Sequence, residues 1–487
     1  MQKIIDFIHR QWEEGWPQES HDLLQEFLEG AERYPKKASE IAAIRAPKMS
    51  PDSGVAFTAL IHPSNPDSGA YGGMSFVIFP IKDGPSLVAM GIGTQGLSPD
   101  ENILGRPGHA RKVQAICSWI NKVFGRGQLI AWAKQDPVRI DENIPQNIRN
   151  LYPQYKSVFD RYGPVLYGIF VPTDDPAATE KIVTAFLDLF FEERGITPLT
   201  KYRDEYEDIR SQYLGHLMPS VSNEDVVELL RERRYVILEG PPGTGKTMMA
   251  RQILKDQYEG HGNTIQFHPS ITYEQFIGGL APVKAEGGFG FRFEPKRGFL
   301  MESVVEAVKN GAKPYLLHVD EINRGDLAKV LGESIFLFEY AAREEREVSL
   351  PYDFGDTIHS TFRLPSNLHL LGTMNTADRS IAIVDVAIRR RFAFVKLWPQ
   401  MSVVGEYGCQ LMQKAFRDIL SIFVEYASEE AFNLVPGHAY FLEQDEGRAK
   451  TALKINLAPL LEEYLAQGYV AGFSDPIRAY IQWINSL

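Results

Sequence analysis

The chain has 487 residues, of which 44% are hydrophobic and 23% are charged, and its formal net charge is −12. This length predicts about three domains, and the ordinary composition excludes a chain that is disordered throughout. Cys117 and Cys409 lack the paired spacing of a zinc finger or a disulfide scaffold. Without an apolar run long enough for a membrane span, and without a signal-peptide pattern, we expect a cytoplasmic protein.

The first 215 residues are predicted to form one α+β domain, because strands and helices mix without a regular βαβ rhythm. A helical apolar pattern opens the chain at residues 4–8, and Asp83-Gly84 is a strong hairpin-turn signal. Further strands are predicted at 55–61, 75–81, 87–91, 129–133 and 167–171, and further helices at 112–124 and 177–191.

Between residues 103 and 139, seven basic residues stand against a single acidic one. One interpretation is the solvated face of an ordinary domain, and the other is a surface that contacts nucleic-acid phosphates. On the second interpretation, the expected contacts are made by Arg106, Arg111, Lys112, Lys122 and Arg126. Reading a base would also require a pocket with aromatic walls that holds an extruded base. Aromatic residues, however, more often belong to the hydrophobic core. The candidates for these walls are Tyr71, Phe76, Trp119 and Trp132.

The charged segment 194–220 is predicted to be a linker, after which Ser222 and Asp225 are placed to form a capping box that opens a helix. From Tyr235 the pattern becomes α/β, and after about Gln400 it is mostly helical. We therefore expect an N-terminal target-recognition domain over 1–215, an α/β core over 216–400 and a C-terminal helical domain over 401–487.

A glycine-rich loop follows directly on a short apolar strand at 235–238, and a helical pattern follows the loop. Its residues are Gly240, Pro241, Pro242, Gly243, Thr244, Gly245, Lys246 and Thr247. Strand, glycine-rich loop and helix are the context that a phosphate-binding loop requires, because backbone N–H groups and the helix N-terminus then converge on phosphate oxygens. We expect Lys246 to reach the β- and γ-phosphates and Thr247 to ligate Mg²⁺.

A second apolar run, 315–319, ends in the adjacent carboxylates Asp320 and Glu321. Carboxylates at such a strand end, 74 residues after Lys246, predict the second half of a nucleotide site. Asp320 would hold Mg²⁺, and Glu321 would orient and deprotonate the attacking water.

A third apolar run, 368–373, leads to Asn375, which we expect to hydrogen-bond the attacking water or the γ-phosphate. Three consecutive arginines follow at 389–391. They form either a solvated turn or an arginine finger for a neighbouring subunit, and a finger would require a ring or filament of subunits.

Four segments together resemble the AAA+ module of the McrB type, the motor subunits of modification-dependent restriction systems. They are GPPGTGKT at 240–247, LLHVDEINR at 316–324, GTMNTADRS at 372–380 and AIRRRF at 387–392. Residues 267–270 and 437–442 fit the same group. The resemblance covers about residues 220–487, and MNTADRS discriminates best, because most AAA+ proteins carry a different sensor segment.

The resemblance implies a five-stranded AAA+ sheet with a helical lid from about Gln400, and hexamers. It also implies GTP rather than ATP as the nucleotide, and a separate McrC-like nuclease subunit. By position, it makes Asn375 the sensor residue and places Arg324 beside the site. Asp378 and Arg379 belong to the family signature, and Arg389 and Arg390 become candidate fingers.

Two glycine-rich or polar segments are predicted to be hairpin insertions. Residues 277–298 contain Gly287, Gly288 and Gly290 among aromatics, and we expect this hairpin to point toward the ring pore. Residues 343–365 are expected to form the second hairpin. Either hairpin would serve as a translocating or clamping surface, or be an inert insertion.

The leading hypothesis is an NTP-driven motor, with GTP the expected nucleotide, of a restriction or anti-phage complex, with no nuclease activity in this chain. Its N-terminal domain would recognise DNA or another specific target. The main alternative is an ATP-dependent protein-remodelling chaperone, whose N-terminal domain would bind polypeptide. A third reading, an NTP-sensing switch with little turnover, is discouraged by the presence of both Glu321 and Asn375.

Overall fold

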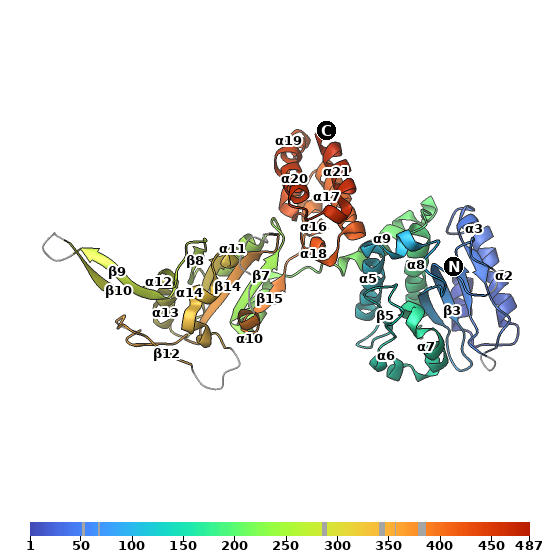
Figure 1. Cartoon of the computed structure of the whole chain (residues 1–487), viewed down its shortest axis with the longest axis horizontal. Helices are drawn as coiled ribbons and strands as arrows, with labels where there is room; N and C mark the ends of the chain where they lie inside the picture. Colours follow the sequence, from blue (N-terminus) through green and yellow to red (C-terminus); the bar gives the residue numbers. More distant parts are fainter. Residues whose placement is uncertain (51–53, 67–68, 285–289, 340–345, 356, 378–385) are drawn as a thin grey trace. The chain divides into compact units, whose positions relative to one another are not determined.

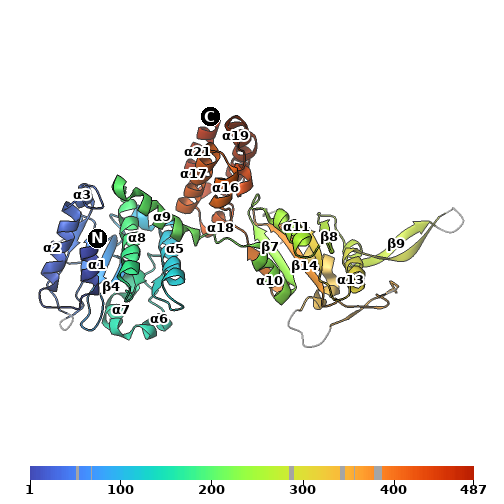
Figure 2. The same cartoon turned by 180° about the vertical axis from the view of Figure 1, so that it is seen from behind.

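The structure is a computed structural model that describes the whole chain except residues 51–53, 67–68, 285–289, 340–345, 356 and 378–385. The chain divides into two compact units (Figures 1 and 2). Unit 1 contains residues 1–217 and 424–428, and unit 2 contains residues 218–423 and 429–487. In the described part of the chain, no helix is both long and apolar enough to cross a membrane.

Unit 1 is built on an antiparallel sheet with the strand order β1-β2-β3-β4-β6-β5. Its strands are β1 (Ala43–Arg45), β2 (Thr58–Ile61), β3 (Met74–Phe79), β4 (Leu87–Ile92), β5 (Ala131–Ala133) and β6 (Leu166–Phe170). Alternate residues of a strand point to opposite faces. Phe76 and Ile78 therefore join one hydrophobic core, whereas Val77 and Phe79 join another. Both faces of the sheet are buried.

The helices of unit 1 cover the two faces unequally. They are α1 (Gln2–His9), α2 (Trp16–Glu29), α3 (Ala38–Ile41), α4 (Glu101–Leu104), α5 (Pro107–Val123), α6 (Gln146–Leu151), α7 (Lys156–Tyr162), α8 (Pro176–Glu192) and α9 (Arg203–Gly215), with 3₁₀ turns η1 (Pro153–Tyr155), η2 (Gly163–Val165) and η3 (Thr200–Tyr202). The larger core collects α1, α2, α5, α8 and α9, and the smaller one collects α6 and α7. This mixed architecture agrees with the α+β expectation.

The charged segment 194–220 is not the linker that its composition suggested. Helix α9 buries Tyr206, Ile209 and Tyr213, and Ile209 and Tyr213 belong to the larger core of unit 1. The three positions are spaced three and four residues apart and so share one helical face. The many charged residues between them hid this apolar stripe.

Unit 2 contains a parallel sheet of five strands in the order β15-β7-β14-β11-β8. They are β7 (Tyr235–Gly240), β8 (Gly262–Gln266), β11 (Tyr315–Asp320), β14 (Leu368–Asn375) and β15 (Ala393–Lys396). Hydrophobic clusters lie on both faces, as is usual for a parallel sheet. The five-stranded sheet that the resemblance implied is confirmed.

Short helices connect these strands. They are α10 (Asn223–Arg233), α11 (Lys246–Asp256), α12 (Tyr273–Phe276), α13 (Phe299–Lys309), α14 (Leu327–Leu331) and α15 (Val386–Arg389), with 3₁₀ turns η4 (Ile322–Arg324) and η5 (Gly332–Leu337). Helix α10 begins with the expected capping box: the Ser222 hydroxyl accepts from the Asp225 N–H, and the Asp225 carboxylate accepts from the Ser222 N–H.

The remainder of the chain is helical, as predicted from its pattern after Gln400. It comprises α16 (Met401–Tyr407), α17 (Gln410–Tyr426), α18 (Glu429–Phe432), α19 (Glu446–Ala452), α20 (Ala458–Ala466) and α21 (Ser474–Ser486), with η6 (His438–Phe441), the π-helical turn η7 (Leu453–Leu457) and η8 (Ala471–Phe473).

Both predicted hairpins are present in the described residues. Strands β9 (Gly278–Lys284) and β10 (Phe291–Arg297) pair antiparallel, and β12 (Val348–Ser349) pairs antiparallel with β13 (Thr361–Phe362). Of the glycines that indicated the first hairpin, Gly290 is described, whereas Gly287 and Gly288 lie outside the described residues.

Candidate functional site

The predicted site residues converge because three neighbouring strands end at one edge of the sheet. Strand β14 lies between β7 and β11, and all three run parallel. Gly240 at the end of β7 is in register with Asn375 at the end of β14. Asp320 ends β11. Ligands of open α/β sheets bind at this carboxyl edge.

The glycine-rich loop has the backbone that its sequence predicts. Gly243 and Gly245 both have φ = +80°, a left-handed conformation that favours glycine. The chain then enters α11, whose first residue is Lys246. The free N–H groups of the first turn of α11, together with the helix dipole, make this end of the loop attractive to anions.

Lys246 is buried on the inner side of this loop. Its ammonium donates to the carbonyl oxygens of Gly240 and Pro241, at 3.0 and 2.8 Å. Burial lowers the pKa of the ammonium to about 8, although the carboxylates of Asp320 and Glu321 act in the opposite direction. The charged form is thus short of stabilisation, and an anion beside it would restore it.

Asp320 is held by two hydroxyl groups from different elements. Its Oδ1 accepts from Thr247 Oγ1 at 2.8 Å and from Thr373 Oγ1 at 2.5 Å. Thr373, on β14, also accepts from the N–H of Glu321 at 3.2 Å. Thr373 therefore ties both carboxylate residues to the central strand. No motif in the sequence marks Thr373, and only its place two residues before Asn375 could have indicated it.

Glu321 occupies a backbone conformation that is uncommon for a residue with a side chain. Its φ is +51°, in the left-handed region, and its carboxylate forms an ion pair with Arg324. Non-glycine residues seldom adopt a positive φ, and those that do are found often at functional sites. Arg324, expected beside the site, is thus placed in direct contact with the residue expected to activate water.

Asn375 is half-buried at the end of β14, where its carbonyl oxygen accepts from the Asn323 side-chain amide at 3.3 Å. The next residue, Thr376, donates its N–H to the carbonyl of Gly240, at 3.0 Å. The sensor segment is therefore bound to the phosphate-binding loop by its backbone. Asp378 and Arg379 lie outside the described residues.

The three consecutive arginines differ in their surroundings. Arg389 and Arg390 are exposed on and just after α15, and the Arg389 guanidinium lies 4.9 Å from the ring centre of Phe394. Arg391 is buried and donates to the carbonyl of Ala387 at 2.8 Å. Arg389 and Arg390 are thus the pair that faces solvent, where a neighbouring molecule is accessible.

A segment of the helical region is hydrogen-bonded to the loop. Gly437 donates its N–H to the carbonyl of Pro242 at 3.0 Å, and Ala439 donates to that of Gly243 at 2.9 Å. A Cβ on Gly437 would lie 2.1 Å from the Gly243 backbone, so this approach requires glycine. In the sequence, residues 437–442 stand out only through their family resemblance, which does not place them at the loop.

A cavity of about 640 Å³ opens beside Gly243. Polar and apolar surface line it in similar proportion, and Glu443 and Asn456 are among its polar lining residues. The apolar contribution includes Met412, Tyr440, Leu442 and Ile455. Ile455 and Asn456 belong to the π-helical turn η7, a type of irregularity that is frequent at functional sites.

These residues fit a magnesium–triphosphate group. The Thr247 hydroxyl and the Asp320 carboxylate, 2.8 Å apart, are hard oxygen ligands of the kind that Mg²⁺ prefers. Mg²⁺, when bound in such sites, neutralises charge on the phosphate oxygens. The chain's own residues would orient the triphosphate through Lys246 and the α11 N-terminus and take a proton from water at the Glu321 carboxylate.

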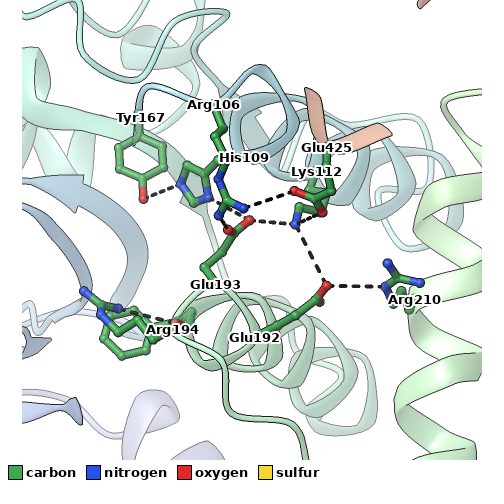
Figure 3. A network of polar contacts seen from close by, with 10 residues as sticks. Arg106, His109, Lys112, Tyr167, Glu192, Glu193, Arg194, Arg210 and Glu425 are labelled. Carbon is green, nitrogen blue, oxygen red and sulfur yellow. Dashed lines mark hydrogen bonds and ion pairs between the residues drawn. The ribbon is translucent and has the colours of Figure 1, made fainter. Parts of the chain in front are cut away.

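The basic stretch of unit 1 does not form one exposed surface. Figure 3 shows Arg106, His109 and Lys112 gathered around the carboxylate of Glu193. The side chain of Lys112 is only 2% exposed, and its ammonium lies 2.7 Å from Glu193 and 2.6 Å from Glu425. Arg106 pairs with the same two glutamates.

Arg111 is committed to internal bonds as well. Its guanidinium donates to the carbonyl oxygens of Val424 and Ala427, both at 2.6 Å, within the part of the chain assigned to unit 1. The expectation that Arg111 and Lys112 face nucleic acid is corrected, because both are buried among carboxylates and carbonyls of unit 1. Arg106 pairs with two of the same carboxylates but stays partly exposed. Lys122 and Arg126 are exposed.

The aromatic candidates for a base pocket divide in the same way. Phe76 and Trp119 are each 1% exposed and belong to the larger core of unit 1. Tyr71 and Trp132 are half-buried beside the smaller core. The core interpretation therefore holds for the first two residues.

Comparison with known proteins agrees with this geometry. Residues 235–392 match the model of the AAA domain of the dynein-related subfamily. The chain is 32% identical over 294 residues to the "Type IV methyl-directed restriction enzyme EcoKMcrB subunit" of Escherichia coli strain K12, an alignment that covers 55% of this chain and 60% of that protein. The chain thus spans less than two thirds of this relative.

A second relative is the "Type II restriction enzyme BsuMI component YdiS" of Bacillus subtilis strain 168. It is 28% identical over 275 residues, covering 47% of this chain and 78% of that protein. A solved structure of a putative ATPase from Cytophaga hutchinsonii matches at 18% identity, covering 51% of this chain and 65% of that one. Its TM-score is 0.24, so it supports no structural argument.

These matches confirm the resemblance to the McrB type and the presence of an AAA+ P-loop module. They support nucleoside triphosphate hydrolysis in general and do not favour the chaperone alternative.

Proposed function

We propose that the protein is the GTP-hydrolysing motor subunit of a DNA restriction complex that includes a separate nuclease subunit. The observation that carries the hydrolytic part is the convergence of Lys246, Thr247, Asp320 and Glu321 at one sheet edge. The restriction part is supported by the two relatives, whose names describe them as a subunit and a component of restriction enzymes.

Glu321→Gln tests the hydrolytic part. The variant keeps the shape of the side chain but removes the base, so it should bind nucleotide as the wild type does and hydrolyse it at least 100-fold more slowly. Glu339→Gln, in the same unit and outside the site, is the matched control. Turnover at the wild-type rate in Glu321→Gln would remove this residue from its role.

The cavity beside Gly243 supports guanine as the base. Phosphate-binding residues do not distinguish bases, so selectivity must come from groups that reach the ring edge. Glu443 supplies a carboxylate to the cavity, and a carboxylate accepts the two neighbouring N–H donors of guanine. The corresponding edge of adenine presents an acceptor nitrogen, which a carboxylate repels.

Glu443→Gln tests this choice of base. The ratio of kcat/KM for GTP to that for ATP should fall about 10- to 100-fold, because a charge-assisted pair of hydrogen bonds is lost. Hydrolysis itself should persist. Glu462→Gln, an exposed residue on α20 that does not line the cavity, is the control. An unchanged ratio would remove Glu443 from base selection without affecting the hydrolytic assignment.

Arg389 and Arg390 are proposed to complete the site of a neighbouring subunit in a ring, which we expect to be a hexamer. Both are exposed, as a group that acts on another molecule must be. If the arginine acts in trans, Arg389→Ala or Arg390→Ala should lose hydrolysis alone and recover part of it when mixed with Glu321→Gln. The mixed ring places an intact Glu321 site beside an intact arginine. A mixture as inactive as its components would argue against action in trans.

The nuclease partner is tested by co-purification. The full-length protein, expressed with its neighbouring genes, should retain a second protein that cuts DNA only when GTP is hydrolysed. Glu321→Gln should retain the same protein but not support cutting. Target recognition by unit 1 remains part of the proposal, with Lys122 and Arg126 as the exposed candidates for phosphate contact.

A further inference from the structure

The hairpin formed by β9 and β10 carries an apolar face that no described residue covers. Its register pairs Phe291 with Lys284, Phe293 with Pro282 and Pro295 with Leu280. Directly opposed residues of an antiparallel pair point to the same face. All six residues are exposed, so this face of the two-stranded sheet is open. Figure 1 shows the hairpin as the slender extension of unit 2 beyond α12 and α13.

The two phenylalanines dominate that face. Phe291 is 76% exposed and Phe293 is 67% exposed, among the highest values for large hydrophobic side chains in the described chain. Neither ring belongs to a hydrophobic core that the described residues of unit 2 form. An exposed aromatic pair on a short sheet does not stabilise the fold, so it indicates a surface that another molecule covers.

The spacing of the two rings suits a nucleic-acid base. Residues i and i+2 of a strand lie about 7 Å apart, and stacked bases are separated by about 3.4 Å. One base therefore fits between two aromatic rings that stand two residues apart on the same face. Stacking of this kind requires an unpaired base, whose faces are accessible.

The charges of the hairpin also favour a polyanion. Its described strands carry the four basic residues Lys284, Arg292, Lys296 and Arg297, against the single acid Glu294. Arg292 forms an ion pair with Glu294, and Arg297 donates to the carbonyl oxygens of Phe354 and Gly355. The excess positive charge therefore comes from Lys284 and Lys296, in a chain whose net charge is −12. Lys284 lies directly opposite Phe291 on the aromatic face. A cation beside a stacking platform is the combination that single-strand binding sites use.

We propose that this aromatic face, defined by Phe291, Phe293 and Lys284, binds single-stranded DNA, with one base stacked between the two rings and a phosphate at Lys284. The choice of DNA over RNA rests on the proposed restriction function. Binding does not require hydrolysis, so the surface is tested separately from the nucleotide site.

The test is fluorescence anisotropy of a labelled 20-nucleotide oligothymidine with the full-length protein, at low and at moderate salt. Phe291→Leu and Phe293→Leu keep the apolar bulk but remove the ring, and each should weaken binding about 5- to 100-fold. Phe293→Tyr should bind as the wild type does. Lys284→Gln should reduce the salt dependence of binding. Leu280→Ala, on the same face but away from the two rings, is the control.

Three results would overturn the proposal. The first is unchanged affinity in the two leucine variants. The second is a duplex of the same length that binds as tightly and depends equally on the two rings. The third is loss of self-association, seen by sedimentation velocity, in the leucine variants with no specific loss of DNA affinity, which would identify the face as a contact between copies. NTP hydrolysis without DNA should be unchanged in all these variants, so it verifies that they fold.

Discussion

Two buried lysines, one in each unit, show how differently the same side chain is used. Lys112 in unit 1 lies within 4 Å of the carboxylates of Glu193, Glu425 and Glu192. Burial lowers the pKa of its ammonium, but these carboxylates outweigh burial, and the net shift is upward. Lys246 in unit 2 contacts mainly carbonyl oxygens, and burial lowers its pKa to about 8.

The difference separates a structural cluster from a binding site. The charges around Lys112 satisfy one another, so a ligand would have to displace existing ion pairs. No described residue forms a direct ion pair with Lys246, so an anion that binds beside it would interact strongly with its charge. A lowered lysine pKa in a loop of converging donors is therefore the more informative sign of function.

Lys112→Met should have the largest effect and should act on stability. Removing the ammonium leaves Glu193 and its neighbours buried with less compensation, which should lower the free energy of unfolding of unit 1 by about 3–5 kcal/mol. Urea unfolding followed by circular dichroism measures it. Lys122→Met, an exposed lysine on the same helix, should change it little. Equal stability of both variants would show that the cluster is not a structural one.

Lys246→Met should weaken nucleotide binding and leave the stability of the nucleotide-free protein intact. It should weaken nucleotide binding about 100-fold, since a charged hydrogen bond to phosphate is lost. Stability without nucleotide should not fall, because the buried ammonium is disfavoured in the folded state. Calorimetric titration and thermal unfolding test the two halves, with Lys255→Met on the exposed face of α11 as the control. A variant that unfolds without nucleotide would contradict the comparison.

The pH dependence of nucleotide binding should show whether Lys246 differs from Lys112 in the pKa of its ammonium. Above its pKa of about 8, Lys246 is neutral in the free protein and must take up a proton to bind phosphate as a cation. Affinity should therefore fall as pH rises above 8, by up to tenfold per pH unit. Titrations in buffers of different ionisation enthalpy detect the proton uptake. Affinity that is flat between pH 7.5 and 9.5 would show that Lys246 keeps its charge.

Thr373→Val should have the smallest effect. The variant removes the hydroxyl that joins Asp320 to the backbone of Glu321 while keeping the shape of the side chain. We expect kcat to fall about 3- to 10-fold, with little change in nucleotide affinity, because the loss is one neutral hydrogen bond that positions the acids. Steady-state kinetics measures it, and Thr361→Val on β13 is the control. A loss confined to affinity would assign Thr373 to binding instead.

Much of unit 2 was predictable because its signals are local. The left-handed glycines at 243 and 245, the helix that starts at Lys246 and the capping box at Ser222 depend on residues within a few positions of one another. Such short-range preferences act in any tertiary context, so the pattern and the structure agree.

Unit 1 was less predictable because the fate of its charges depends on distant partners. The sequence of the helix that carries Arg111 and Lys112 is also compatible with a solvated face. The residues that bond these two side chains, Val424 and Glu425, lie 313 positions further along the chain. Composition also concealed the apolar stripe of α9.

The sequence by itself determined the phosphate-binding loop, the acidic strand end and the order of helices and strands around them, because backbone conformation and hydrophobic periodicity are properties of neighbouring residues. Only the tertiary structure decided which charges are neutralised internally and that Thr373 and Gly437 contact the site. It also decided that two phenylalanines of the hairpin stand uncovered. Burial and pairing are properties of segments that meet in space, and no local pattern records them.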